Sequence, residues 1–542
     1  MELLSQVLGA VLGFLRCLLL LIWIEPLLGT KSKSVDADKV ATTYEEWAAW
    51  QFEYDALHGV DDWVNIDRHS SYDWQVLRSL KRDLERCRRL GDDRGLCNQL
   101  RAQSSRNMCR ILSPALFRKS PVQTKRLIHD YIKEVRQCIA HIADRHSFGA
   151  GTTIVSSQEK RQVLNDMRTA LGRTTLALQG GAMVSMSHLG VVKALYLQRL
   201  LPQIITGTGS GALIAALVCA TPDDGLLDVL GGSRIDLEAF DRAGIRRSTG
   251  RWFSWPWPGS SVLATIRRRY RRYRTKKHFF DIDILQECVR DNLGDLTFEE
   301  AYAKTGRILN ITIAMSEVAG TPQLLNYITA PHVLVWSAVV ASIATSKQMY
   351  APVQLLCKSE TGAVTLYFAA DSSEKGSKRH DAVHPEAPLQ RIGELFNVNH
   401  FIVSQTRPYV APFIEWQQAA DHHQPLGVIV RFWLDEWLHW LEVLNAFGML
   451  PTFLQRVLMD EVVPSFASWS KISITPQIRL WDLFGLFETP TAARLQAWSL
   501  RGERRTWPSI CELRCRCDIE FTLDAAYARV RRRATAAIIN PT

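Results

Sequence analysis

The sequence predicts an α/β protein, with a mostly parallel sheet flanked by helices and with helical regions before and after it. Three observations indicate this fold. Short apolar runs alternate with helical patterns from residue 173 onward, as in parallel sheets with helices on both faces. Glycine-rich turns follow two of these runs, at the strand ends where such sheets bind ligands. Apolar residues at three-to-four spacing predict helices between residues 44 and 143.

Composition indicates an ordered protein with an anionic partner. A chain of 542 residues has room for several domains, and 47% hydrophobic with 22% charged residues is typical of globular proteins. The formal net charge is +10, and the chain holds 17 tryptophans. Excess arginine with interleaved aromatic residues favours contact with lipid headgroups or nucleic acid.

The N-terminus predicts a membrane-anchoring segment over residues 1–40. Its apolar stretch, Leu3–Gly29, is long enough to span a bilayer, although two charges interrupt it and Pro26 breaks its end. Lysines follow the stretch, so we expect the rest of the chain on the cytosolic side. A signal peptide is not expected, because no basic cluster or cleavage site is present. The alternative is an apolar helix that packs on the protein's own core.

Residues 41–172 predict a helical N-terminal domain. The segments Trp74–Leu90 and Thr124–Asp144 each carry an apolar face opposite a charged face. We interpret both as packing helices whose charges face solvent.

Residues 173–412 predict the α/β domain. The expected strands are Thr174–Gly181, the run that leads into the turn at 207–211, Arg307–Ser316 and Asn399–Gln405, and the expected helix after the first strand is His188–Leu201. An insertion at 248–278 combines aromatic and basic residues: Trp252, Trp255, Trp257, Arg267, Arg268, Arg269, Arg271 and Arg272. This composition favours a membrane-surface contact; a solvated insertion and a nucleic-acid contact are the alternatives.

Residues 413–542 predict a helical, tryptophan-rich C-terminal region. Trp433, Trp437, Trp440 and Leu444 recur at helical spacing, so they form an apolar face that packs on the core or lies on a membrane or lipid-droplet surface. The last part predicts an amphipathic helix with a basic tail.

The cysteines predict reduced thiols rather than a metal site. Among the 11 cysteines, only Cys511, Cys515 and Cys517 cluster, and they have no histidine at zinc-finger spacing in the sequence. No phosphate-binding loop of the G-x-x-x-x-G-K-[ST] type is present and the glycine pair is a poor dinucleotide signature, so we expect no metal and no other cofactor.

The turn from Gly207 to Gly211 bears directly on catalysis. A G-x-S-x-G turn between a strand and a helix can present a nucleophilic serine at a sharp bend. Here the central position is Gly209, and the serine, Ser210, comes one residue later.

Together these segments resemble the patatin-like lipid acyl hydrolases, in the branch of fungal and plant triacylglycerol lipases. The resemblance rests on LALQGGAMVSMSHLGVVKALYLQRLLPQIITGTGSGALIAALV and on later matches such as ELFNVNHFIVSQ, and it covers roughly residues 45–480. It implies a patatin-like fold and hydrolysis of acyl esters by a Ser–Asp dyad. The family's glycine-rich loop, which supplies the oxyanion hole, falls on Gly180, Gly181 and Ala182, where the family's last glycine has become Ser185.

The resemblance places both dyad positions on other residues. The nucleophile position is Gly209, and the aspartate position, counted back from Glu394–Phe401, is His380. Ser210 and Asp381 each lie one residue later and are the candidate dyad; Asp371 is a second candidate for the aspartate. One residue at a helix start rotates a side chain by about 100°, and a misplacement of about 1 Å can cost roughly 10²-fold in rate.

We therefore expect a membrane-associated, cytosol-facing acyl hydrolase at the endoplasmic reticulum or lipid droplet. Its implied substrates are triacylglycerol or phospholipid, its membrane partner is anionic lipid, and nucleic acid is not expected. The alternative is a catalytically inactive lipid-binding pseudoenzyme, whose helix N-termini would still favour a phosphate or carboxylate. His278 and Asp283 form an H-x₄-D pattern of the kind found in acyltransferases, but they read equally well as a capped helix start.

Overall fold

The structure is a computed structural model that describes residues 41–144, 156–236, 282–313, 324–344, 353–359, 361–367, 388–407, 471–476 and 491–539, with residues 274, 436, 439, 443 and 482. The chain divides into two compact units, one of residues 1–58 and 408–468 and the other of 59–407 and 469–542. In the first unit, a capping box at Thr43 begins α3 (Tyr44–Leu57). The predicted four-part division of the chain stays a prediction.

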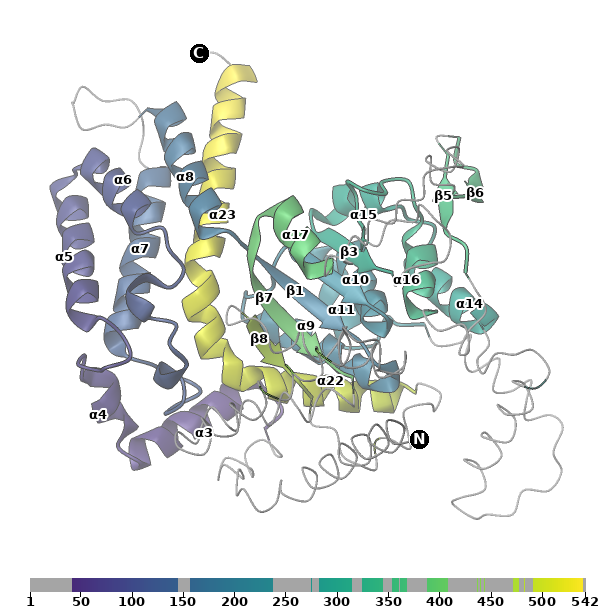
Figure 1. The fold of residues 1–542 in the computed structure, drawn as a ribbon, viewed down its shortest axis with the longest axis horizontal. Helices are drawn as coiled ribbons and strands as arrows, with labels where there is room; N and C mark the ends of the chain where they lie inside the picture. The colour runs from purple at the N-terminus through teal and green to yellow at the C-terminus, as the bar shows by residue number, and fades with distance from the viewer. Residues whose placement is uncertain are drawn as a thin grey trace. The chain divides into compact units, whose positions relative to one another are not determined.

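The second unit contains a six-stranded sheet (Figure 1). It is mostly parallel, and this confirms the fold class that the sequence predicts. Its spatial order is β4-β3-β2-β1-β7-β8, and the pairs from β3 to β8 are parallel, whereas β4 is antiparallel to β3. The strands are β1 (Arg173–Gln179), β2 (Ile204–Thr208), β3 (Ile308–Thr312), β4 (Leu324–Leu325), β7 (Val398–Gln405) and β8 (Lys471–Ile474). The central strand β1 is buried along its length except at its two ends.

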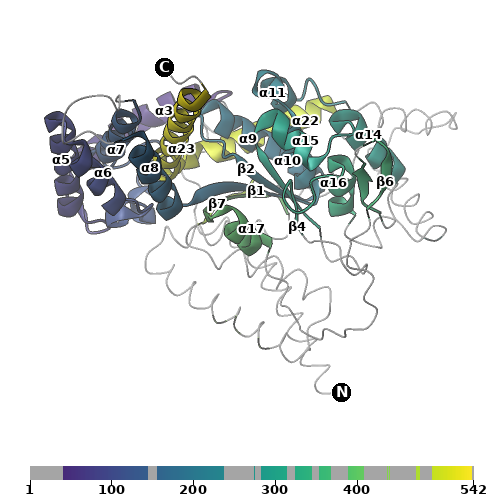
Figure 2. The ribbon, with the colours of Figure 1, turned by 90° about the horizontal axis from the view of Figure 1, so that it is seen from above.

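Helices cover both faces of the sheet (Figure 2). On one face lie α9 (Ser187–Leu197) and α10 (Ser210–Ala220), and α17 (Pro388–Phe396) lies on the other, where it packs against apolar residues of β2, β3, β4 and β7. Nearly all of α10 is buried, because its sequence is apolar on every side. The remaining elements are α11 (Asp223–Leu230), α14 (Ile282–Leu293), α15 (Phe298–Thr305), α16 (Val335–Ile343) and a hairpin of β5 (Leu356–Lys358) and β6 (Val364–Leu366).

Strand β8 is an element that the sequence did not predict. Its four residues, KISI, carry only two apolar side chains, Ile472 and Ile474, both of which are buried. A run this short gives little periodic signal. Pairing with β7 makes it a strand, and that pairing joins segments about 70 residues apart.

The helical layer consists of α5 (Trp74–Leu90), α6 (Asp93–Ala102), α7 (Arg126–Asp144), α8 (Ser157–Leu171) and α23 (Ile510–Ile539). Its core is a continuous apolar cluster to which these helices contribute. The predicted helices at 74–90 and 124–144 are confirmed, the second beginning at Arg126. The predicted C-terminal helix is confirmed as α23. Although it comes from the other end of the sequence, it packs against α7 and α8 and contributes to the same apolar cluster (Figure 1). The shorter segments α4 (Val60–Asn65), η2 (Met108–Arg110) and η3 (Pro114–Leu116) complete this part.

Two helices connect the sheet to the helical layer. Helix α22 (Ala492–Thr506) packs closely on α9, because a Cβ on Gly190 would lie 1.7 Å from the Ser499 carbonyl oxygen and one on Gly502 would lie 2.0 Å from that of Ser187. A 3₁₀ turn, η7 (Trp507–Ser509), then leads directly into α23. The chain therefore passes from the α/β part into the helical layer without a loop.

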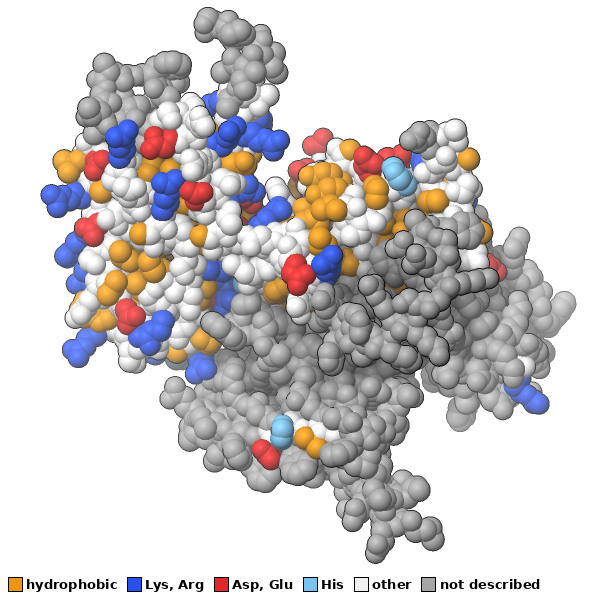
Figure 3. All heavy atoms as spheres, turned by 45° about the horizontal axis from the view of Figure 1, so that its top comes forward, with side chains coloured by type: hydrophobic (Ala, Val, Ile, Leu, Met, Phe, Trp, Pro, Cys, Tyr) orange, Lys and Arg blue, Asp and Glu red, His pale blue; other side chains and the backbone are white. Residues whose placement is uncertain are grey.

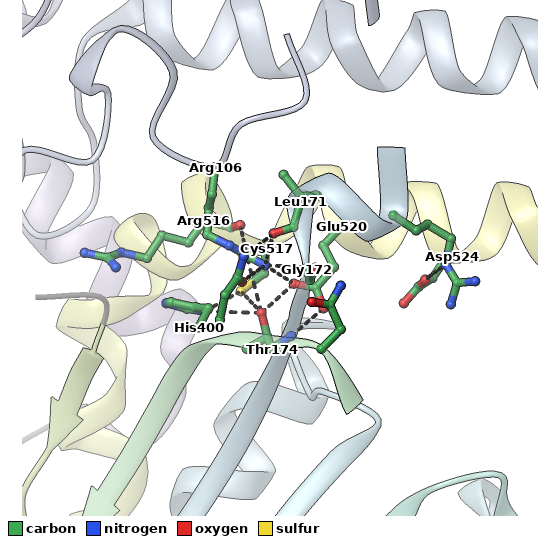
Figure 4. A network of polar contacts seen from close by, with 12 residues as sticks. Arg106, Leu171, Gly172, Thr174, His400, Arg516, Cys517, Glu520 and Asp524 are labelled. Atoms are coloured by element: carbon green, nitrogen blue, oxygen red, sulfur yellow. Dashed lines mark hydrogen bonds and ion pairs between the residues drawn. The ribbon is translucent and has the colours of Figure 1, made fainter. Parts of the chain in front are cut away.

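A buried arginine joins the helical layer to the start of β1 (Figure 4). Arg106 donates to the carbonyl oxygens of Arg516 (2.8 Å) and Gly172 (3.2 Å) and pairs with Glu520 at 3.0 Å. The Glu520 carboxylate also accepts from the Thr174 backbone N–H at 2.7 Å. Both charged side chains are nearly excluded from solvent, so each depends on the other for compensation.

Within the described part of the chain, no helix is long and apolar enough to cross a membrane. The predicted anchor at 1–40 lies outside the described residues, as do the predicted membrane-contact residues of the insertion and the tryptophans of the 433–440 face. These three predictions stay predictions.

Candidate active site

The glycine-rich turn lies where β2 ends and α10 begins. Gly209 immediately precedes α10 with φ +61° and ψ −132°, a conformation that L-residues rarely adopt. Its N–H donates to Ser342 Oγ of α16 at 2.9 Å, and the Ser342 hydroxyl donates to the Thr312 carbonyl of β3 at 2.7 Å. The bend is therefore held by a hydrogen bond to α16, and the Ser342 hydroxyl that accepts this bond is itself fixed by β3.

The loop after β1 packs directly on this turn. A Cβ on Gly180 would lie 2.2 Å from the Gly211 nitrogen, and one on Gly211 would lie 2.2 Å from the Leu178 carbonyl oxygen. By contrast, a Cβ on Gly209 would meet only the Gly180 carbonyl oxygen at 3.5 Å, an ordinary contact. Glycine is thus required at 180 and 211 by close approach, whereas at 209 it is required only by the backbone angles.

Ser210 is the first residue of α10, one position past the bend. Its Oγ atom is buried and has no hydrogen-bond partner among the described residues. It faces Gly180, since a Cβ on that glycine would lie only 2.5 Å from the Ser210 oxygen. The structure thus brings Ser210 against the predicted oxyanion loop, with its hydroxyl beneath the loop.

The two candidate partners of Ser210, Asp381 and Asp371, lie outside the described residues, as does His380 at the family's aspartate position. The Ser210–Asp381 dyad stays a prediction. So does the H-x₄-D pattern, since His278 also lies outside them, while Asp283 stands in the first turn of α14.

Two of the three predicted oxyanion-loop amides have partners inside the protein. The Gly180 N–H donates to the Thr208 carbonyl oxygen and the Gly181 N–H donates to Thr406 Oγ1, each at 3.1 Å. Ala182 begins the 3₁₀ helix η4 (Ala182–Met186), and amides in the first turn of a helix have no partner within it. Further donors of this kind come from the first turn of α10.

A buried histidine braces the same loop from behind. His188 Nδ1 lies 2.8 Å from Ser404 Oγ, and its Nε2 lies 3.3 Å from Thr406 Oγ1. Complete burial lowers the pKa of His188 to about 3, so the ring is neutral at physiological pH. These contacts make His188 a packing residue that supports the loop.

Sequence reasoning missed the supporting hydroxyls of Ser342 and Thr406. Neither follows a glycine-rich pattern, and Thr406 stands among the polar residues Ser404, Gln405 and Arg407, so the sequence does not single it out. Ser342 stands in the apolar run at residues 335–343. A hydroxyl in such a run predicts burial, and buried hydroxyls usually hold a specific partner. The site therefore combines a sharp bend at Gly209, the Gly180 loop packed against it, and backbone N–H donors. Because the residue at the bend is glycine, no side chain stands at its apex.

Comparison with known proteins gives the family. Residues 28–169 match a domain of unknown function, DUF3336, and residues 176–358 match the patatin-like phospholipase domain. Triacylglycerol lipase ptl1 of Schizosaccharomyces pombe is 30% identical over 512 residues, which cover 91% of this chain and 85% of the relative. Triacylglycerol lipase 5 of Saccharomyces cerevisiae is 27% identical, with 93% of this chain and 66% of the relative covered.

A plant relative extends this range, since triacylglycerol lipase SDP1L of Arabidopsis thaliana is 30% identical over 90% of this chain and 57% of its own length. Among solved structures, the type III effector ExoU matches at 12% identity over 67% of this chain and 62% of its own, with a TM-score of 0.26. The chain belongs to the patatin-like phospholipase family, in the branch that includes the triacylglycerol lipases of fungi and plants.

Proposed function

We propose that the chain is an acyl hydrolase of lipid catabolism, acting on the esters of triacylglycerol or phospholipid at a membrane or lipid-droplet surface. The observation that carries this proposal is the bend at Gly209, whose angles and hydrogen bonds keep the strained strand-to-helix turn on which such enzymes hold a nucleophile. Family membership supports the same reaction class.

In this proposal Ser210 is the nucleophile. Its Oγ atom has no hydrogen-bond partner among the described residues, so turning it toward a substrate breaks no bond to any of them. The oxygen attacks the ester carbonyl while its proton passes to the Asp381 carboxylate. First-turn amides of η4 and α10 stabilise the oxyanion. The proton then moves to the departing glycerol oxygen, and water hydrolyses the acyl-enzyme to fatty acid.

A second candidate is favoured by the residues at the bend itself. Gly209 provides no nucleophile at the apex, and the Ser210 oxygen is enclosed beneath Gly180. In this case the chain binds acyl lipid at the same site without cleaving it. The two candidates share the ligand and differ only in whether an ester bond breaks.

Labelling with a serine-reactive fluorophosphonate separates them. The full chain is compared with Ser210→Ala and Gly209→Ser variants, and fatty-acid release from triolein and phosphatidylcholine is measured in parallel. The hydrolase proposal expects labelling and release that Ser210→Ala abolishes. An unlabelled wild type that releases no fatty acid contradicts it. Labelling that appears only in Gly209→Ser would support the lipid-binding candidate, because the rest of the site would then be competent.

The surface location rests on charge and composition. On the face drawn in Figure 3, most visible Lys and Arg side chains lie over the helical layer, in keeping with the net charge of +10. Cations near anionic lipid contribute about 1 kcal/mol each. The described helices add no membrane span, so surface binding would depend on these charges and on the aromatic and apolar segments of the sequence. The cytosolic face of the endoplasmic reticulum and the lipid droplet are the proposed locations.

A further inference from the structure

Two cysteines and a histidine from opposite ends of the chain meet in the helical layer. Cys511 and Cys515 lie four residues apart at the start of α23, so their side chains share one face of the helix. His129 comes from the first turn of α7, which packs against α23. The cysteines are buried, and His129 reaches the surface at the edge of the group. The histidine that the sequence spacing lacks is thus supplied by the fold.

The three ligand atoms are close enough for one ion. Both sulfurs and a ring nitrogen of His129 lie within 4.8 Å of one another. A tetrahedral zinc ion has Zn–S bonds of about 2.3 Å and Zn–N bonds of about 2.0–2.1 Å. Its ligand atoms are then about 3.5–3.8 Å apart. Closing the group around an ion shortens the distances between these atoms by at most about 1.3 Å, which side-chain torsion changes can supply.

The three side chains face one another where α7 packs on α23, because their ligand atoms gather within 4.8 Å of one another. Thiolates and imidazole are the ligands that zinc prefers, whereas magnesium and calcium prefer carboxylate and carbonyl oxygens. The chemistry of the group therefore selects a soft, four-coordinate metal.

A cavity of about 580 Å³ adjoins the group and includes His129 and Cys515 in its wall. It offers a route for the ion and space for a fourth ligand. The carboxylate that lines it, that of Asp518, is paired with Arg136 at 3.1 Å. The fourth position is therefore left to water.

We propose that His129, Cys511 and Cys515 bind a zinc ion, with a water molecule from the cavity as the fourth ligand. The ion would join α7 to the first turns of α23, immediately after the chain leaves α22. Because α22 packs on α9 of the α/β part, the ion would brace the helical layer at the point where it meets that part. This inference does not depend on the proposed hydrolase activity.

Zinc content of the purified full chain tests the proposal. The chain is expressed with zinc, dialysed against metal-free buffer and analysed by mass spectrometry of the metal. We expect one zinc per chain in the wild type. Losing a partner outside the ligand shell typically weakens metal binding by about 10–100-fold. Losing a ligand, as in Cys511→Ser or His129→Asn, is therefore expected to weaken it by more than about 100-fold.

Cys517→Ser is the matched control. This cysteine is buried on the same helix, but its sulfur lies 3.9 Å from Thr174 Oγ1 and 4.0 Å from His400 Nδ1, away from the proposed site. The control should keep its zinc. Cobalt substitution gives a second readout, because tetrahedral thiolate-bound Co²⁺ has visible bands that Cys511→Ser should lose.

Several results would overturn the proposal. The first is a wild-type chain that is purified without stoichiometric zinc and also fails to bind added zinc. The second is an equal zinc content in the wild type and in Cys511→Ser. The third is a disulfide between Cys511 and Cys515 in the freshly purified chain. His129→Asn guards against misfolding, since the histidine is exposed and its variant should keep the wild-type circular dichroism spectrum.

Discussion

Replacing Gly209 by serine restores a hydroxyl at the bend, and the structure gives its cost. The backbone angles of +61° and −132° are retained only against strain, which costs about 1–3 kcal/mol for a residue with a side chain. No steric cost adds to this, because the new Cβ would lie 3.5 Å from the Gly180 carbonyl oxygen. At about 2–4 °C per kcal/mol for a domain of 150–250 residues, we expect the melting temperature to fall by about 2–12 °C.

Two further variants separate strain from packing. Gly209→Ala carries the same backbone cost without the hydroxyl and should melt within a few degrees of Gly209→Ser. Gly180→Ala should be more destabilising than either, because its Cβ would lie 2.2 Å from the Gly211 nitrogen, in contact with backbone that cannot turn aside. Thermal melts followed by circular dichroism measure all three. The reasoning is refuted if Gly180→Ala is tolerated while Gly209→Ala unfolds the protein.

Other perturbations test the parts that support the site. Arg106→Leu should cost about 3–5 kcal/mol because it leaves the Glu520 carboxylate buried without its cation; urea unfolding measures this. The double variant with Glu520→Leu is the control and should recover part of the loss, because it removes the uncompensated charge but leaves the Thr174 N–H without its acceptor. Burial lowers the pKa of His188 to about 3 in the folded protein, so below pH 6.5 the unfolded state binds more protons than the folded state. The free energy of unfolding therefore decreases as the pH is lowered from about 6.5 to about 3, by up to about 1.4 kcal/mol per pH unit. His188→Asn should make this acid dependence shallower between pH 6.5 and 5, and an unchanged slope would contradict the burial argument. In flotation with phosphatidylserine vesicles, the wild type should float with the lipid, whereas a variant with Arg→Gln at 267, 268, 269, 271 and 272 should stay in the protein fraction. Equal amounts of both proteins with the vesicles would exclude that segment as the lipid contact.

The sequence alone determined the local features of this protein. Apolar periodicity located α5, α7 and α23, and alternation of strands and helices located β1, β2, β3 and β7, because each pattern reports which face of a single element is buried. The order of glycines and serine in the second turn was also legible without coordinates, and it placed Gly209 at the apex. These inferences need only neighbouring residues.

Tertiary structure decided what distant segments do to one another. It paired the short β8 with β7, set Thr406 and His188 behind the glycine loop, and turned the Ser210 hydroxyl beneath Gly180. It also brought His129 to the cysteines of α23. No local pattern encodes such contacts, because they depend on how whole helices and strands pack, and that packing is a property of the complete core rather than of any one segment.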